Sequence, residues 1–420
     1  MTINGNNCAK RRMGYLVVLI MLTVVNCIHS VPTVQHKYHT HEELQAILIE
    51  MNETYDSHTY LYSIGQSVQQ NELYVIAIAG NNPEKHVIGR PEVKYVGNMH
   101  GNEVVGRELL IQFIEHLLYN YETDDDIKKF LDNTRVHIMV TMNPDGFEIS
   151  GEDCSGNVGR MNANGFNLNR NFPDYFEENE DPIQPETRAV MDWLEEIPFI
   201  LSANLHGGAL VVNYPFDNTE PENKAEEPYP YAECPDDDVY RNISLIYSKT
   251  HAIMHDIEYN SCNGTDSGFE DGITNGVEWY PAKGTMQDYN YIFTGCLEVT
   301  LEVACCKYPS EDRLELHWDW NRDSMMEYLK QVHKGVKGRV SDENGNPVSG
   351  AIMSIKGRDL DFTTSADGEY WRILLPGLYE LSVRKDGYIS GSSATATVEV
   401  SGILYDVTEQ DFQILSHAQY

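Results

Sequence analysis

The chain has 420 residues, of which 41% are hydrophobic and 23% charged, as in an ordinary globular protein. This length predicts two or three domains. The formal net charge of −35 argues against nucleic-acid binding and favours cationic ligands, although solubility alone would also account for it.

Residues 1–30 have the pattern of a secretory signal peptide. Three basic residues, Lys10, Arg11 and Arg12, precede an apolar run at 15–27 that is too short to span a bilayer comfortably. Cleavage is expected near Ser30, and it would take the net charge from −35 to −38 by removing those three positive charges and no negative one. An uncleaved signal anchor is the alternative. With no later apolar span and no lipid-anchor tail, we expect a soluble mature protein.

Cysteines and sequons point to the same compartment. Six cysteines follow the signal segment, namely Cys154, Cys234, Cys262, Cys296, Cys305 and Cys306, and an even number in an exported protein suggests disulfides. Their spacing does not choose among the possible pairings. The adjacent Cys305 and Cys306 are expected to bond distant partners rather than each other. Glycosylation sequons lie at Asn52, Asn242 and Asn263.

Helix and strand patterns alternate from about residue 41 to residue 332. Apolar residues at helical spacing predict helices over 41–54, 104–119 and 184–196. Short β-rich or apolar runs predict strands over 73–79, 93–97, 135–142, 198–205 and 296–304. This alternation predicts an α/β domain with a mixed or parallel central sheet covered by helices.

The sequence pattern changes near residues 333–335, from alternating helices and strands to short strands alone. Short β-runs at 336–341, 351–356, 369–375, 378–384 and 395–400 are separated by turn signals at Asn344, Asp367, Pro376 and Asp386. No helical period survives there. The sequence therefore predicts a signal peptide at 1–30, an α/β domain at 38–333 and a small β-sandwich at 334–412.

Three residues have the types and placement of a zinc site. His100 and Glu103 lie in a turn between a predicted strand and the long helix, and His206 follows the strand at 198–205. Imidazole and carboxylate ligands suit zinc, and open α/β sheets bind ligands at the C-terminal ends of strands. The H-x-x-E spacing also occurs at His39 and at His255, so on spacing alone a structural histidine remains the alternative.

The wider text resembles the zinc metallocarboxypeptidases, specifically the carboxypeptidase E/N/M/D branch. The resemblance covers roughly residues 38–410, and its segments occur in order: G-N-M-H-G-N-E, N-P-D-G-F-E, L-N-R-N-F-P-D, Q-P-E-T, L-H-G-G, N-Y-P-F-D, M-Q-D-Y-N-Y and E-V-T-L-E. It implies a carboxypeptidase-like catalytic domain with a transthyretin-like β-sandwich after it. It also implies one zinc ion per chain, with His100, Glu103 and His206 as ligands.

The resemblance assigns two catalytic residues. Glu302, in E-V-T-L-E, matches the general base, although a surface acid at a strand end is the alternative, and Glu298 lies on the same strand face. Arg160 matches the arginine that stabilises the charge developing on the scissile carbonyl.

The resemblance also assigns the groups that recognise substrate. Arg170, with the amide of Asn169, matches the site for a free C-terminal carboxylate, and Tyr280 matches a tyrosine that closes over the substrate. Asp217 matches the acid that selects a C-terminal Lys or Arg, and Gln287 matches a polar partner in that pocket. The alternative for Asp217 is a turn residue.

One position departs from the family pattern. Asn167 stands where the family usually has the aspartate that supports the first zinc histidine. An asparagine oxygen can still accept the imidazole N–H, but the ligand would be less basic. Metal affinity or rate could fall as a result.

These observations predict a monomeric carboxypeptidase of the secretory pathway or extracellular space, which releases Lys or Arg from peptides or proteins. No inhibitory propeptide is recognisable before residue 38, so the enzyme is expected to be made active. The alternatives are a weak or inactive binding or sorting protein on the same fold, and a carboxypeptidase with apolar or glutamate specificity.

Overall fold

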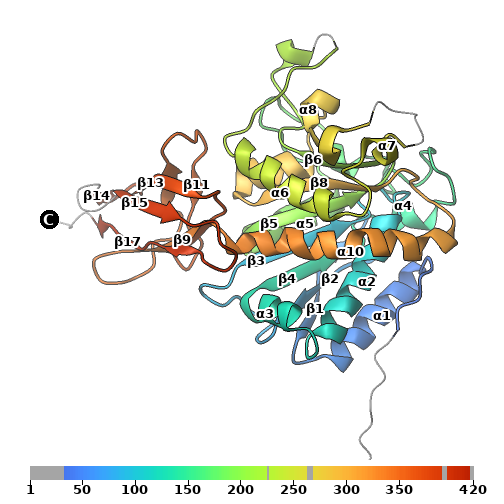
Figure 1. The fold of residues 1–420 in the computed structure, drawn as a ribbon, viewed down its shortest axis with the longest axis horizontal. Helices are drawn as coiled ribbons and strands as arrows, with labels where there is room; N and C mark the ends of the chain where they lie inside the picture. Colours follow the sequence, from blue (N-terminus) through green and yellow to red (C-terminus); the bar gives the residue numbers. More distant parts are fainter. Residues whose placement is uncertain (1–32, 225–226, 263–267, 390–394, 417–420) are drawn as a thin grey trace, which may run out of the picture. The chain divides into compact units, whose positions relative to one another are not determined.

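The computed structural model describes residues 33–224, 227–262, 268–389 and 395–416 (Figure 1). The expected signal peptide at 1–30 and the sequon at Asn263 lie outside these residues. Among the described helices, none is long and apolar enough to cross a membrane.

A mixed sheet of eight strands forms the centre of the first domain, in the order β1-β2-β4-β3-β5-β8-β6-β7. The strands are β1 (Thr59–Gln66), β2 (Glu72–Ile78), β3 (Glu92–Gly97), β4 (Arg135–Met139), β5 (Phe199–His206), β6 (Ala209–Tyr214), β7 (Ile273–Asn275) and β8 (Leu297–Ala304). In the middle, β4, β3, β5 and β8 run parallel, whereas β2 and β6 pair with this group antiparallel. The predicted α/β fold with a mixed sheet is confirmed.

Helices cover both faces of this sheet (Figure 1). They are α1 (His41–Thr54), α2 (Val105–Asn120), α3 (Asp125–Asn133), α4 (Pro144–Glu148), α5 (Pro185–Glu196), α6 (Asp237–Thr250), α7 (Ile257–Asn260), α8 (Gly276–Trp279), α9 (Met286–Tyr289) and α10 (Leu314–Lys330). On one face, α10 packs against α2 and α6, and on the other α5 packs against β1. The three helices predicted from apolar spacing correspond to α1, α2 and α5.

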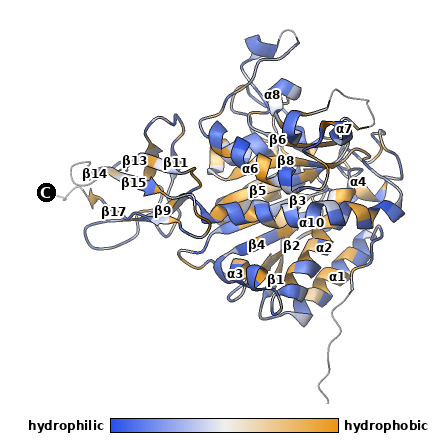
Figure 2. Ribbon diagram, in the orientation of Figure 1, coloured by the Kyte–Doolittle hydropathy of each residue, from blue (hydrophilic) through white to orange (hydrophobic). Residues whose placement is uncertain are grey.

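Alternating side chains divide the core of this domain into two apolar clusters. On β3, Tyr95 belongs to the cluster beneath α2 and α10, whereas its neighbour Val96 belongs to the cluster beneath α5. Both faces of β3 are therefore buried, and its charged residues Glu92 and Lys94 are held in ion pairs. Figure 2 shows mostly hydrophobic residues on the central strands and a mostly hydrophilic visible surface on α10.

The second domain is the predicted small all-β unit. One sheet has the order β11-β10-β13-β15, and the other has the order β12-β9-β16, with β17 also paired to β9. The strands are β9 (Val336–Ser341), β10 (Ile352–Ile355), β11 (Phe362–Thr363), β12 (Glu369–Arg372), β13 (Gly377–Arg384), β14 (Tyr388–Ile389), β15 (Thr395–Val400), β16 (Thr408–Glu409), β17 (Phe412–Gln413) and β18 (Leu415–Ser416). Gly345 and Gly368 have positive φ at two of the predicted turns, where a side chain would be strained.

Two disulfides join distant segments to the end of β8. Cys306 bonds Cys154, and Cys305 bonds Cys262. The expectation that adjacent cysteines bond distant partners is confirmed. Among the described cysteines, Cys234 and Cys296 are unpaired and buried.

A histidine joins the two domains by binding a carboxylate on each side. His86 Nδ1 lies 2.7 Å from Glu92 Oε1 of β3, and His86 Nε2 lies 2.6 Å from Glu369 Oε2 of β12. Hydrogen bonds to Glu369 and Glu92 raise the pKa of His86 from 6.5 to about 9. Proton binding is therefore tighter in the folded state, so this stabilisation is complete below about pH 6.5 and is lost as the pH rises through about 9.

The variant His86→Gln tests this linkage. We expect it to lower the free energy of unfolding by about 1–3 kcal/mol at pH 6 and by much less at pH 9.5, because the wild-type histidine has then lost its proton. Urea unfolding of both proteins at the two pH values measures the difference. An equal loss at both pH values would show that the charge of His86 is irrelevant.

Candidate metal centre

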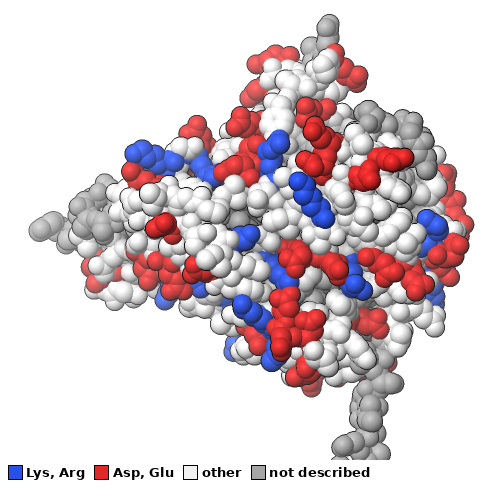
Figure 3. Space-filling model, in the orientation of Figure 1, with Lys and Arg blue, Asp and Glu red and all other residues white. Residues whose placement is uncertain are grey.

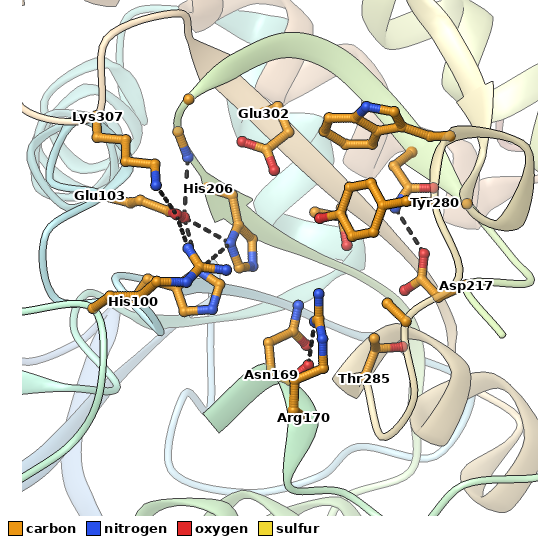
Figure 4. Close-up of a pocket in the computed structure, with 18 of the residues that line it drawn as sticks. His100, Glu103, Asn169, Arg170, His206, Asp217, Tyr280, Thr285, Glu302 and Lys307 are labelled. Atoms are coloured by element: carbon orange, nitrogen blue, oxygen red, sulfur yellow. Dashed lines mark hydrogen bonds and ion pairs between the residues drawn. The ribbon is translucent and has the colours of Figure 1, made fainter. Parts of the chain in front are cut away.

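Three donor atoms meet at the C-terminal edge of the parallel strands (Figure 4). His100 and Glu103 lie in the turn between β3 and α2, and His206 is the last residue of β5. His100 Nδ1 and His206 Nδ1 lie 2.9 Å and 2.8 Å from Glu103 Oε2, and 3.1 Å from each other. All three side chains are buried, so the three predicted ligands form one group.

The protonation pattern of this group calls for a cation. His100 Nε2 lies 2.9 Å from Asn167 Oδ1, an acceptor, so the imidazole carries its proton on Nε2. Burial lowers the pKa of His100 to about 3, which keeps the ring neutral and leaves a lone pair on Nδ1. That lone pair faces the Glu103 carboxylate. Two acceptors in contact are stabilised by a metal ion between them, and this donor set fits zinc with one position left open.

Among the described residues, His86, Asp367 and Glu369 form a second group whose possible ligand atoms lie within 4.8 Å of one another. Both ring nitrogens of His86 already bind carboxylates, and its raised pKa keeps it protonated at neutral pH. A protonated imidazole has no lone pair for a metal. The group around His206 is therefore the candidate metal centre.

Asn167 performs two tasks at the position where the sequence departs from the family pattern. Its side-chain oxygen accepts the His100 N–H and also caps the short helix η1 (Leu168–Arg170) by accepting from Asn169 N at 3.0 Å. The asparagine thus keeps the orientation of the ring. It does not supply the negative charge that would make the imidazole a stronger ligand.

A cavity of about 350 Å³ opens beside the three donors. Glu302, on β8, stands directly across from His206 in the register of the parallel strands, and it lines this cavity. Its Oε2 atom is buried without a hydrogen-bond partner among the described residues. Burial, and next the charge of Glu103, raise the pKa of Glu302 to about 7.

Glu298, which lies on the same strand as Glu302, has a different environment. It is fully buried and does not line the cavity. Its carboxylate accepts from Lys94 Nζ at 2.9 Å and from Asn204 Nδ2 at 2.9 Å. Glu298 therefore neutralises a buried lysine within the sheet.

Two arginines and a tyrosine border the same cavity. Arg160 NH1 donates to Glu103 Oε1 and to His100 Nδ1, at 2.5 Å and 3.1 Å. Asn169 Oδ1 accepts from Met286 N, which leaves the amide NH₂ group available to a ligand. The Arg170 guanidinium lies 6.0 Å from the centre of the Tyr280 ring.

Asp217 lies in the bend after β6 and lines the cavity with a buried carboxyl group. Burial raises its pKa, while hydrogen bonds from Asn213 and Thr285 act in the opposite direction. Its backbone N–H donates to the buried carboxylate of Asp288, at 2.9 Å from Oδ2. A desolvated acid held in this way discriminates strongly in favour of a cationic side chain.

The residues that line the cavity differ at a few positions from the site residues predicted from the sequence. Gln287 is fully buried, with no hydrogen-bond partner for its amide among the described residues, but it does not line the cavity. Asn213, Thr285 and Lys307 do line it and were not predicted. Asn213 lies within the N-Y-P-F-D segment and could have been found there, whereas nothing in the sequence singles out Lys307.

Comparisons with known proteins match most of the chain. A zinc carboxypeptidase model matches residues 44–324, and a carboxypeptidase regulatory-like domain model matches residues 335–412. The chain is 46% identical to carboxypeptidase M of Mus musculus over 363 residues, which are 86% of this chain and 81% of that protein. It is 46% identical to carboxypeptidase D of Anas platyrhynchos over 375 residues, but these cover 88% of this chain and only 26% of that longer protein.

A solved structure supports the fold alone. The crystal structure of carboxypeptidase A from Helicoverpa armigera superposes with a TM-score of 0.54 at 16% identity. It covers 70% of this chain and 73% of that one.

Proposed function

The chain belongs to the zinc carboxypeptidase family, and we propose that it hydrolyses the last peptide bond of peptides and proteins to release a C-terminal Lys or Arg. The observation that carries this proposal is one cavity lined by the His100–Glu103–His206 group, Glu302, Arg170 and the buried acid Asp217. Among the described residues, Glu302 Oε2 has no hydrogen-bond partner. Figure 4 shows these side chains turned toward the same space.

Glu302 and Arg160 are assigned the chemical roles. A zinc ion held by the three donors supplies Lewis acidity beside them. Glu302 accepts a proton from the attacking water and passes it to the leaving amine, a task open to a carboxylate that lines the cavity beside the three donors. Arg160 donates hydrogen bonds to the carbonyl oxygen of the scissile bond as that oxygen gains charge.

Arg170 and Asn169 are assigned to the free carboxylate of the substrate. An arginine can bind a carboxylate through two parallel hydrogen bonds, and the available NH₂ group of Asn169 adds a third donor. Tyr280, which is 42% exposed, stands where it can cover the bound residue.

Asp217 is assigned to the side chain of the released residue. A Lys or Arg pairs with this buried acid, whereas an apolar side chain leaves it desolvated and unpaired. The chain contains 65 acidic and 30 basic residues. The resulting excess of negative charge on the surface also favours basic peptides (Figure 3). Gln287 is assigned to the same pocket by its place in the M-Q-D segment alone.

A binding or sorting role without catalysis is the second candidate. Asn167 favours it, because the first histidine then lacks an acidic partner. Against it stand the three metal donors, Glu302 and both arginines, all of which are present in the cavity. The two disulfides support assignment to the secretory pathway or extracellular space, where we propose that a monomer with one zinc ion acts.

Asn167 gives a prediction about the metal. The variant Asn167→Asp is expected to bind zinc about tenfold more tightly, because a carboxylate makes the His100 imidazole more basic, and Asn167→Ala about 10- to 100-fold more weakly. Competition with a chromogenic chelator measures the zinc dissociation constant of each variant. Equal zinc affinity in all three proteins would contradict the role of this residue.

The exopeptidase proposal is tested with a peptide that ends in Arg and with its C-terminal amide. The free acid should lose one residue, while the amide should be cleaved at least about 100-fold more slowly, since it gives Arg170 no charge to bind. Mass spectrometry of the products reports both. Equal cleavage of the two peptides, or cleavage at an internal bond, would refute the assignment.

A further inference from the structure

Lys307 is a cation in the cavity with no role in the mechanism above. It lies five residues beyond Glu302, directly after the two disulfide-bonded cysteines that follow β8. Its ammonium Nζ lies 4.0 Å from Glu103 Oε1, which is a long ion pair, and its side chain is 16% exposed. Among the described residues, this is the only carboxylate that pairs with Lys307.

The backbone of Lys307 is fixed by two hydrogen bonds and a neighbouring disulfide. Lys307 N donates to Cys154 O at 3.3 Å, and Lys307 O accepts from Val104 N at 3.1 Å at the start of α2. The Cys154–Cys306 disulfide fastens the same point to the loop that carries Arg160. The position of this lysine is therefore well defined.

The side chain of Lys307 depends on a glycine. Its stem runs across Gly208, the second glycine of L-H-G-G, where an added Cβ would lie 3.0 Å from Lys307 Cε. Gly208 has a φ of +117°, which also disfavours any other residue. This glycine leaves room for the lysine stem at the edge of the metal centre.

Figure 4 shows Lys307 and Asp217 on opposite sides of His206. In the proposed function, the C-terminal side chain enters toward Asp217 and the terminal carboxylate meets Arg170. The residue before the scissile bond must then leave the metal centre on the side of Lys307. Once a metal ion engages the Glu103 carboxylate, the ammonium has no other paired acid among the described residues and can interact with substrate.

We propose that Lys307 is a specificity-determining residue for the penultimate residue of the substrate, favouring an acidic side chain there and disfavouring a basic one. This inference rests on the proposed function for the direction in which the peptide lies. The half-buried ammonium attracts a Glu at the penultimate position and repels a Lys there. Both effects therefore increase the ratio of the rate for a peptide with Glu to the rate for a peptide with Lys.

The test uses three peptides that are identical except for endings in Glu-Arg, Ala-Arg or Lys-Arg. The wild-type holoenzyme should show kcat/KM in that order, with about a tenfold ratio between the first and the last. The variant Lys307→Met should bring this ratio close to one, and Lys307→Glu should reverse it. The matched control is Lys356→Met, which removes the same charge from an exposed residue of the β domain and should keep the wild-type ratio.

A binding measurement supplies a second readout. Non-cleavable analogues of the Glu-Arg and Lys-Arg peptides, with a methylene in place of the scissile carbonyl, should bind wild-type protein with the same order of Kd, and Lys307→Met should remove the difference. Raising the salt concentration should reduce it as well, because the interaction is between partly exposed charges.

The outcomes separate the two proposals. If the wild-type enzyme released Arg from the three peptides at equal rates, the role of Lys307 would be overturned and the proposed function would stand. This outcome does not depend on whether any variant folds. A uniform fall across the three peptides in Lys307→Met would also overturn it, since that result would show an effect on Glu302 or Glu103 alone. Failure to release Arg from any peptide would instead refute the proposed function.

Discussion

Glu302→Gln is expected to lose about 10²- to 10⁴-fold in kcat while it keeps its fold and its zinc. The amide has nearly the same shape as the carboxylate but cannot accept a proton. Burial and the nearby Glu103 raise the pKa of Glu302 to about 7, and a cation bound by the three donors lowers it, so the carboxylate is the base at neutral pH. Steady-state kinetics with an Arg-ending peptide, together with zinc analysis and thermal unfolding, make the comparison.

The matched control is Glu298→Gln on the same strand. Glu298 neutralises Lys94 in the sheet, so its loss leaves a buried, unpaired charge and should lower the free energy of unfolding by about 3–5 kcal/mol. The two variants are therefore expected to differ in kind, one in catalysis and the other in stability. If Glu302→Gln retained a kcat within tenfold of the wild type, the general-base assignment would be wrong.

Asp217→Asn should change the substrate rather than the chemistry. Removing one partner of a buried charge pair costs about 2–5 kcal/mol, so kcat/KM for a peptide ending in Arg should fall about 30-fold or more. The same variant should act on a Phe-ending peptide about as well as the wild type does, or better, because the pocket no longer holds an unpaired charge. Kinetics on the two peptides, with both proteins, give the change in preference.

The pH dependence of Asp217 adds a second expectation with a defined sign. Burial raises the pKa of this carboxyl group, so its charge is lost at a higher pH than for an ordinary aspartate. The affinity for Arg should therefore weaken as the pH falls, and this dependence should be absent in Asp217→Asn. An unchanged KM for Arg-ending peptides in the variant would show that Asp217 is a structural residue.

Much of the site could be predicted because its residues stand at strand ends within local motifs. The turn after β3 presents His100 and Glu103, and β5 ends on His206, so parallel pairing alone brings the ligands together. The register that places Glu302 opposite His206 follows from the pairing of β5 with β8. Burial on both faces explains why apolar residues stand next to one another at the start of β5 instead of alternating with polar ones.

The elements that were not predicted have weaker local patterns. β1 exposes residues along its length at the edge of the sheet, and β6 is a short run that directly follows the glycines of L-H-G-G. The long helix α10 mixes Trp, His and Asp with its apolar residues, so its helical period is faint in the sequence.

Other features depend on tertiary contacts that no local pattern encodes. The disulfide pairing could not be predicted, because both cysteines after β8 bond cysteines that are far away in the sequence. Lys307 belongs to no recognisable motif, and its place in the site depends on its neighbours Gly208 and Glu103. Gln287 was assigned from its motif alone, and it is not among the residues that line the cavity.

A mixture of two peptides that differ only in the last residue, Arg or Phe, tests the central claim most directly, because both compete for the same enzyme in one tube. We predict that mass spectrometry will show loss of Arg from the first peptide well before any loss of Phe, that a chelator will stop the reaction, and that added zinc will restore it. Faster release of Phe, or a rate that does not respond to the chelator, would contradict the account.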